Sequence, residues 1–328
     1  MKTIEILEQF DRKEFDALAP HPLQSFAWGE VREATGIRVV RFGEFENGKM
    51  IAVYQMTVHK LPKVPYYIGY IPRSLVPSME AVSFMHAWAK KEKIIFIKWE
   101  PYQSAKEGSA AMAALPHMRL SRHPLFTEWN QEVSLLGTPE EVYQKFKKNT
   151  RYSIRRATEL GATATEMSTD EGFQIFSDLY FGTVKRQEYH GHTRTYHKTI
   201  WKKMSDAGIA KIFVAFFDGK PQAAFEIFFW HDRAYYPYSG SADANRHVPA
   251  TQLLMWQVIQ DAKKAGLTTL DLWGSLPEEH NKKHPWAGFT LFKSGFGSQY
   301  VHMTKSHDQV VFPALYHLYS GVYFLRSL

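Results

Sequence analysis

The chain has 328 residues, with 40 lysines and arginines against 33 aspartates and glutamates, a formal net charge of +7 and no cysteine. With 45% hydrophobic and 22% charged residues, it has the composition of a folded globular protein, which excludes extended disorder. The lack of cysteine excludes a disulfide scaffold, a cysteine nucleophile and thiolate-bound metal.

The length and both ends of the chain bear on its organisation. A single hydrophobic core stops growing at roughly 250 to 300 residues, so two domains are expected. The segment from Met1 to Asp11 mixes acids with apolar residues and lacks the pattern of a signal peptide. The charge-free stretch from Val310 to Leu325 carries His317 and is shorter than the roughly 20 residues of a membrane-spanning helix. We therefore expect a cytoplasmic protein.

The predicted elements occur twice in the same order. The first half predicts strands at 39–45, 50–58 and 66–71, a helix at 81–91 and a strand at 94–99. The second half predicts strands at 211–217, 223–230 and 234–239, a helix at 251–264 and a strand at 268–273. Each half thus reads as an antiparallel meander followed by a helix and a strand.

This order predicts an α+β fold of two tandem domains, with mixed sheets covered by helices. It resembles the acyltransferase fold of the GNAT type, in which the sheet opens after the third strand. We expect that opening in both halves, beside Tyr70 and Tyr238. A helix start at Thr138 and Pro139 follows a boundary near residue 131, which gives domains 1–130 and 131–303.

The turns after the two third strands bear on the acyl donor. Coenzyme A would need a glycine-rich turn whose N–H groups surround the pyrophosphate. The corresponding segments, 72–77 and 244–249, contain no glycine. The sequence therefore favours a different acyl donor and predicts no cofactor.

A basic segment runs from Lys145 to Ala157. As a helix it would present Lys147, Lys148, Arg151 and Arg155 on one arc, able to contact successive phosphates, or simply to face solvent. Its cations form the predicted RNA-binding set: Lys147, Lys148, Arg151, Arg155 and Arg156.

A second segment, from Thr290 to Gly297, encloses Lys293 between aromatic and glycine residues. Such a lysine can stabilise a developing oxyanion, or it can belong to a turn and reach solvent. The histidine groups at 190, 192 and 197 and at 280 and 284 lack a metal-binding pattern, so no metal is predicted.

Taken together, these segments resemble the FemABX family of peptidyltransferases, over nearly the whole chain. The resemblance rests on Gln24 to Glu30, Lys148 to Ala157, Tyr180 with 185–189, Asp271 to Gly274, Leu291 to Gly297 and Val311 to Tyr319. The stretch 189–213 is too short for the helical arm of some members, so the chain resembles the arm-less, FemX-like ones. The resemblance also implies that a C-terminal segment, 304–328, completes the first domain.

The resemblance implies specific roles for charged residues. Lys293 would stabilise the tetrahedral intermediate. Arg32 would contact the diphosphate of a peptidoglycan precursor, although lysine is the residue type expected there, and Arg186 would be the second diphosphate ligand.

Aromatic residues complete the predicted substrate site. Tyr70, Tyr189 and Tyr238 would line the substrate groove. Arg73 and Phe292 belong to the segments after the first third strand and around Lys293, and they complete the substrate-binding set.

The reaction implied by the resemblance transfers an amino acid from aminoacyl-tRNA to an amine of the precursor's stem peptide, which builds interpeptide bridges. Asp271 and Glu226 are the candidate general bases. The acceptor can be nucleotide-linked or lipid-linked, with peripheral contact at the inner membrane face, and a monomer is expected. The alternative is a GNAT-like N-acyltransferase with another amine or another activated donor.

Overall fold

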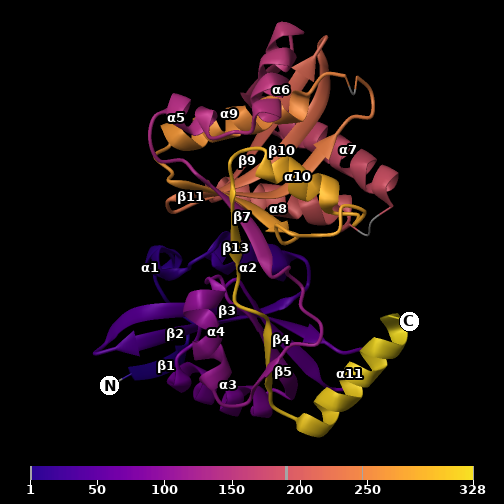
Figure 1. Ribbon diagram of the computed structural model, residues 1–328. Helices are drawn as coiled ribbons and strands as arrows, with labels where there is room; N and C mark the ends of the chain where they lie inside the picture. The colour runs from indigo at the N-terminus through magenta and orange to yellow at the C-terminus, as the bar shows by residue number, and fades with distance from the viewer. Residues whose placement is uncertain (1, 189–190, 246, 328) are drawn as a thin grey trace. The chain divides into compact units, whose positions relative to one another are not determined.

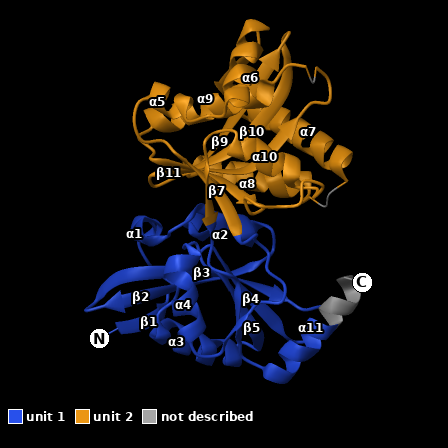
Figure 2. Cartoon of the chain, viewed as in Figure 1, with its two compact units in different colours: residues 1–128, 302–328 blue, residues 129–301 orange. Residues whose placement is uncertain are grey.

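The computed structural model describes residues 2–188, 191–245 and 247–327. It divides into two compact units, unit 1 with residues 1–128 and 302–328 and unit 2 with residues 129–301 (Figure 2). The boundaries predicted from the sequence, 130/131 and 303/304, lie close to these divisions. No helix in the described ranges combines the length and the apolar character that crossing a bilayer requires.

Unit 1 is built from strands and helices taken from both ends of the chain (Figure 1). Its elements are β1 (Lys2–Ile6), α1 (Arg12–Leu18), η1 (Pro22–Gln24), α2 (Phe26–Ala34), β2 (Arg38–Glu46), β3 (Lys49–Lys60), β4 (Tyr67–Pro72), α3 (Met79–Lys91), β5 (Ile94–Glu100), α4 (Ala105–Ala114), β6 (Met118–Leu120), β14 (His307–Val310) and α11 (Pro313–Ser327).

The sheet of unit 1 has the strand order β1-β2-β3-β4-β5-β14-β6. Its strands pair antiparallel except β4 with β5, so the sheet is mixed. The larger core lies between the sheet and α3, where Met85 packs with Phe42 and Trp99. On the other face Tyr316 of α11 packs on Phe96 of β5. The C-terminal segment thus supplies both a strand and a covering helix to unit 1.

Unit 2 repeats the element order. Its elements are β7 (Trp129–Ser134), α5 (Pro139–Gln144), α6 (Lys148–Glu159), β8 (Thr163–Glu166), α7 (Asp170–Gln187), α8 (Arg194–Asp206), β9 (Ala210–Phe217), β10 (Lys220–Trp230), β11 (Arg233–Ser241), α9 (Ala250–Lys264), β12 (Thr269–Ser275), α10 (Ala287–Ser294) and β13 (Gln299–His302).

The sheet of unit 2 has the order β13-β7-β12-β11-β10-β9-β8 and is again mixed, because β11 runs parallel to β12 while β10 runs antiparallel to both of its neighbours. Alternate residues of β10 face opposite layers. Phe225 and Ile227 join the core under α9, whereas Phe228 faces Tyr238 on the side of α7 and α8. The predicted α+β class with helix-covered mixed sheets is confirmed.

The predicted opening after the third strand is correct for unit 2 and wrong for unit 1. In unit 2, β11 and β12 pair only from Arg233/Thr269 to Tyr235/Asp271, although β11 continues to Ser241. In unit 1, β4 and β5 stay paired through Pro72/Glu100, to the end of both strands. Tyr70 therefore lies within a closed strand pair, opposite Lys98.

Candidate active site

The site in unit 2 begins with a break in β12. The register of β12 against β7 shifts between Asp271 and Gly274, and Trp273 between them has a positive φ of 67°. The fully buried carboxylate of Asp271 stabilises this bulge, because it accepts the Trp273 N–H at 2.6 Å and the Asn130 amide at 3.0 Å. Beyond the shift β12 pairs with β7 again, with Gly274 opposite Asn130, so the Gly274 carbonyl lies directly after a bulge, a feature common beside active sites.

Lys293 of α10 reaches that carbonyl. Its Nζ donates to the Gly274 oxygen at 2.6 Å and lies 3.6 Å from the centre of the Phe289 ring. The side chain is 0% exposed. The segment from 290 to 294 belongs to helix α10 and is not a turn. Its lysine side chain is buried inside unit 2 and does not reach solvent.

The surroundings of Lys293 set its protonation. Burial lowers the pKa of Lys293 well below its usual range, and the negative charge of Asp271 acts in the opposite direction. Desolvation disfavours the ammonium form, while a nearby carboxylate favours it. Asp271 and Lys293 thus interact in a low-dielectric interior, where a charge acts strongly on a reacting group.

The glycines after Lys293 allow the end of α10 to pack closely on the first turn of α6 and on the residues before it. A β-carbon at Gly295 would lie 2.4 Å from the Thr150 hydroxyl, and one at Gly297, where φ is +66°, would lie 2.5 Å from the Lys145 carbonyl oxygen. Lys147 N–H donates to the Gly295 carbonyl at 2.9 Å. The backbone contact and the positive φ require glycine at Gly297, whereas the Thr150 side chain beside Gly295 can move. These close contacts hold α10 against the basic segment.

The predicted basic helix is α6, but its cations differ in their surroundings. Lys148, Arg155 and Arg156 are exposed, whereas the half-buried Arg151 donates to the carbonyls of Gln144 at 2.8 Å and Phe146 at 2.6 Å. Arg151 therefore fastens the α5–α6 connection instead of sharing a fully solvated arc.

Lys147 connects α6 to α10, the helix that carries Lys293. Its Nζ donates to the Ser294 hydroxyl at 2.9 Å, and Ser294 directly follows Lys293. Lys147 and Lys148 stand at the N-terminus of α6, whose N-cap makes no side-chain hydrogen bond. Cations at a helix N-terminus oppose the macrodipole, so their presence suits a bound anion better than it suits the helix.

Tyr238 lies in an aromatic layer on the α7 and α8 side of the sheet. It is half-buried, and its ring centre is 4.9 Å from that of His197 and 6.2 Å from that of Tyr180. His197 is fully buried, and burial lowers its pKa to about 4. The imidazole is thus neutral at physiological pH.

Glu226, one of the two candidate bases, is the cross-strand partner of Tyr238. It is 0% exposed, and its carboxyl oxygens have no hydrogen-bond partner among the described residues. Burial raises its pKa to about 8, so the group is mostly protonated near pH 7. A protonated Glu226 does not act as a base at that pH.

Two other predicted residues of unit 2, Arg186 and Phe292, make contacts away from the Lys293 amine. Arg186 of α7 donates to the Ser241 carbonyl at 3.2 Å, in the part of β11 that lies beyond its pairing with β12. The Phe292 ring packs 5.2 Å from that of Phe296 against the core, so the aromatic ring over the lysine amine is that of Phe289 instead. Tyr189 lies outside the described residues, as does His190.

The predicted residues of unit 1 gather around Tyr70. Its hydroxyl donates to Glu100 at 2.6 Å. Burial and the charge of Glu100 raise the pKa of Tyr70 well above its usual range, and the charges of Arg73 and Arg32 oppose this. Arg73 and Arg32 are therefore both within electrostatic reach of Tyr70. Arg73 and Glu100 line a cavity of about 150 Å³.

Sequence reasoning misses two residues of the site. Phe289 lies one helical turn before Lys293, and i, i+4 spacing within an expected helix would identify it as a neighbour. Glu100 closes the buried strand β5, and a carboxylate at the end of an apolar strand is itself unusual. Asp271 is among the predicted residues, and its place in the β12 bulge explains why it is buried.

Three comparisons with known proteins bear on this arrangement. Residues 144–283 match the family described as an acetyltransferase (GNAT) domain. A lipid II:glycine glycyltransferase of Staphylococcus epidermidis is 23% identical over 377 residues, covering 92% of this chain and 90% of the relative.

Two solved structures extend the comparison. A crystal structure of FemX superimposes with a TM-score of 0.86 at 19% identity, covering 97% of this chain and 99% of the other. A tandem GNAT protein from the clavulanic acid biosynthesis pathway gives a TM-score of 0.57 at 12% identity, covering 95% and 99%. The predicted fold of two tandem GNAT-like domains is thereby confirmed.

Proposed function

The chain belongs to the FemABX family and is an enzyme of the acyltransferase class, and on that premise we propose that it transfers an amino acid from aminoacyl-tRNA to an amine of a peptidoglycan precursor. The product is a stem peptide extended by an amide-linked residue, as in interpeptide bridges. The relative from Staphylococcus epidermidis, named for lipid II and glycine, supports the class of acceptor.

One observation carries the proposal: the helix that holds the buried Lys293 is bonded, through the Ser294 hydroxyl, to Lys147 at the start of α6. The exposed residues of α6 include the cations Lys148, Arg155 and Arg156. An acyl centre beside a cationic helix N-terminus suits an acyl donor that carries phosphates. The turn before α9 has no glycine, and Pro249 at the N-cap of α9 makes no side-chain cap, so the pyrophosphate of coenzyme A has no glycine-rich turn to bind.

In the proposed reaction the acceptor amine attacks the ester carbonyl of the aminoacyl-tRNA. The new C–N bond forms, the C–O bond of the ester breaks, and the ribose hydroxyl leaves with the proton lost by the amine. Lys293 stabilises the oxyanion of the tetrahedral intermediate; the Gly274 carbonyl orients its amine, and the charge of Asp271 favours the ammonium form against the effect of burial. Phe289 covers the amine, so the ring must move before substrate reaches Nζ.

The remaining residues are assigned to binding. Arg32 in unit 1 and Arg186 in unit 2 are each proposed as ligands of the precursor's diphosphate. Tyr70, Arg73 and Tyr238 are proposed to contact the acceptor. The proposed transfer reaction requires no resident cofactor in unit 1 or unit 2.

Binding of the donor is assigned to unit 2, and the working location to the cytoplasm. Lys147, Lys148, Arg155 and Arg156 are proposed to contact tRNA phosphates, because all four are exposed and belong to α6 or its N-cap. We propose that the enzyme acts as a monomer and meets the inner membrane face peripherally when the acceptor is lipid-linked.

The experiment is transfer of label from a pool of charged tRNAs to nucleotide-linked and lipid-linked precursors, with acetyl-CoA in a parallel reaction. Label that reaches an acceptor and is abolished by RNase pretreatment of the donor supports the proposal, and it identifies the amino acid and the acceptor. Label that moves only from acetyl-CoA would overturn it in favour of a GNAT-like N-acyltransferase using another amine.

A further inference from the structure

The cavity of unit 1 lies where two parallel strands end. Arg73 directly follows β4, Pro101 directly follows β5, and both line a space of about 150 Å³. Ligands of α/β proteins commonly bind beyond the carboxyl ends of parallel strands. The volume is that of one small amino-acid residue rather than of a nucleotide, so the group it admits is small.

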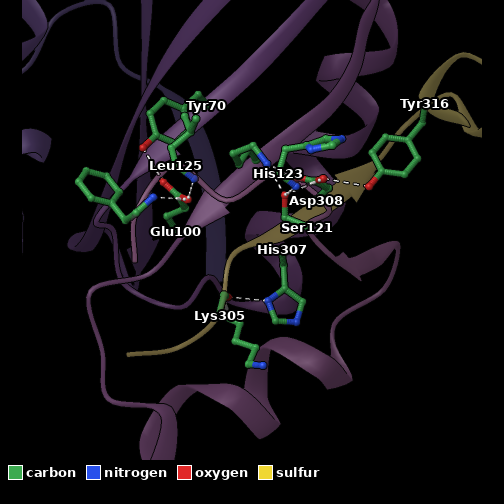
Figure 3. A network of polar contacts seen from close by, with 11 residues as sticks. Tyr70, Glu100, Ser121, His123, Leu125, Lys305, His307, Asp308 and Tyr316 are labelled. Atoms are coloured by element: carbon green, nitrogen blue, oxygen red, sulfur yellow. Dashed lines mark hydrogen bonds and ion pairs between the residues drawn. The ribbon is translucent and has the colours of Figure 1, made fainter. Parts of the chain in front are cut away.

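One wall of the cavity is held by the carboxylate of Glu100. This carboxylate accepts the Tyr70 hydroxyl at 2.6 Å, the Leu125 N–H at 2.6 Å and the Phe126 N–H at 3.2 Å (Figure 3). Both oxygens are thereby occupied, and Glu100 is only 3% exposed. The loop that carries Phe126 is thus fastened over the end of β5.

The beginning of the same loop is held by a second buried acid. Asp308 of β14 accepts the Ser121 hydroxyl at 3.0 Å, the Tyr316 hydroxyl at 2.9 Å and the Lys98 ammonium at 2.9 Å. Figure 3 shows Ser121 and Tyr316 converging on Asp308. With both ends of the loop tied to buried carboxylates, the cavity is formed before any ligand binds, which lowers the entropic cost of binding.

Two groups in the cavity point to an anionic ligand. Arg73 is 2% exposed, has a positive φ of 49° and holds its guanidinium 4.0 Å from the centre of the Phe126 ring. A left-handed non-glycine residue costs energy that structures generally retain at functional sites. Ser306 is 9% exposed, and its hydroxyl has no hydrogen-bond partner in the described part of the chain. A buried hydroxyl without a partner is uncommon and suits a missing ligand.

The charges of the lining select among anions. Lys305 forms an ion pair with Glu128 at 3.5 Å, so the cavity holds two cations and the carboxylates of Glu100 and Glu128. A phosphate dianion would lie beside both carboxylates and be repelled. A single carboxylate, bound by a guanidinium and a hydroxyl, meets less repulsion and matches the fork geometry of arginine.

We propose that this cavity binds the terminal carboxylate of the acceptor's stem peptide through Arg73 and Ser306. The inference rests on the proposed function, because that function supplies a peptide acceptor. It adds a length requirement: the peptide's last residue occupies the cavity, so an acceptor with a blocked or missing terminal carboxylate is recognised less well.

The test measures equilibrium binding of a nucleotide-linked acceptor by calorimetry, without donor, so that it does not depend on transfer. The peptide is compared as the free acid and as the C-terminal amide. We expect the acid to bind about tenfold or more tightly to the native chain, the value of a charge-assisted hydrogen bond. Ser306→Ala and Arg73→Gln should reduce that ratio toward one, while Arg119→Gln, at an exposed arginine of the same unit, should leave it unchanged.

Equal binding of acid and amide by the native chain would overturn the inference and leave the proposed function standing. A ratio that persists in Ser306→Ala would equally overturn it; this smaller change guards against the case in which Arg73→Gln fails to fold. The same acid and amide pair is then measured on the lipid-linked acceptor, and absence of binding of either form of both acceptors would overturn the proposed function and the inference together.

Discussion

Each unit has one parallel strand pair at the equivalent position, β4 with β5 and β11 with β12, and the two pairs end differently. In unit 1, β4 and β5 stay paired to Pro72/Glu100, and the chain then leaves the sheet at Arg73. In unit 2, β11 and β12 separate after Tyr235/Asp271, and a bulge follows. The same element order therefore gives a small cavity beyond a closed pair in unit 1 and a buried lysine at an opened pair in unit 2.

The residues opposite the two equivalent tyrosines differ in the same sense. Thr57 pairs with Tyr70, and its hydroxyl bonds to His59 at 2.9 Å. Glu226 pairs with Tyr238, and its carboxyl has no hydrogen-bond partner in the described ranges. An unsatisfied buried carboxyl costs stability, whereas a satisfied hydroxyl does not. At this position unit 1 has a satisfied polar group, whereas unit 2 retains a buried carboxyl that its stability does not require.

The largest expected effect follows from Glu226. Since burial raises its pKa from 4.5 to about 8, the folded state binds the proton more tightly than the unfolded state. The stabilisation is complete below pH 4.5 and is lost as pH rises to about 8, by up to roughly 5 kcal/mol. Glu226→Gln should remove this slope in the unfolding free energy of unit 2, measured by denaturant titration at a series of pH values.

The matched control is Glu279→Gln, at an exposed glutamate of the same unit. His197 acts in the opposite direction: its pKa, lowered to about 4, gives stability above pH 6.5 that is lost as pH falls toward 4. Because His197 is present in both chains, it cancels in the difference. Parallel pH curves for the native chain and Glu226→Gln would contradict the burial of a titrating carboxyl.

The two units also differ in the space around a glycine of the equivalent strands β4 and β11. A β-carbon at Gly240 of β11 would lie 2.2 Å from the backbone nitrogen of Tyr180 in α7, whereas one at Gly69 of β4 would first meet the Met56 sulfur at 2.6 Å. Backbone cannot yield, but a methionine side chain can. Gly240→Ala should cost about 4 kcal/mol and Gly69→Ala about 1 kcal/mol.

Hydrogen exchange of peptides from each unit measures the loss of stability of that unit alone, because the two units need not unfold together. The losses should be confined to the unit that carries the substitution. Equal losses for the two alanine variants would show that α7 does not press on β11 as described.

Asp271 affects the protonation of the lysine as well as the β12 bulge. Asp271→Asn keeps an acceptor for the Trp273 N–H but removes the charge that raises the pKa of Lys293. We expect the lysine-dependent limb of the pH–rate profile to move to lower pH, and transfer at neutral pH should fall about tenfold for every pH unit by which the limb moves. Asp206→Asn, at an exposed position, is the control. An unmoved profile would separate Asp271 from the chemistry.

The smallest effect concerns the salt dependence of RNA binding. Replacing Lys148, Arg155 and Arg156 together by glutamine should lower the slope of log affinity against log salt by about one for each phosphate that is no longer neutralised. Arg151→Gln should instead reduce stability, since that guanidinium binds backbone carbonyls.

A triple glutamine replacement of Lys90, Lys91 and Lys93 in unit 1 removes the same charge from another exposed surface. It should leave the slope of tRNA binding close to that of the native chain. A slope that changes equally in both triple variants would mean that net charge, and not α6, governs binding.

Much of this architecture is readable from the sequence, and the exceptions have physical causes. Hydrophobic periodicity predicts the strands of both meanders, because their alternation is local. Whether β4 separates from β5 depends on Glu100 and on the loop it binds, which are distant in sequence from β4. No local pattern carries that information.

The candidate site is predictable in part for the same reason. The unusual aromatic and glycine neighbours of Lys293 identify it within the sequence. Its partners Gly274 and Phe289 depend on the β12 bulge and on a helix that residue type alone does not indicate. The roles of Arg151 and Phe292 are hidden from the sequence, because charge and aromatic character do not reveal which side chains bind backbone or enter the core.

The central claim is that the opened strand pair of unit 2 performs the transfer through Lys293. The measurement that tests it most directly is the single-turnover rate of aminoacyl transfer for Lys293→Met beside the native chain, with acceptor binding measured in parallel. The rate should fall about 10²- to 10³-fold, as for loss of an oxyanion-stabilising group, while acceptor affinity stays within about twofold. An unchanged rate would contradict the claim.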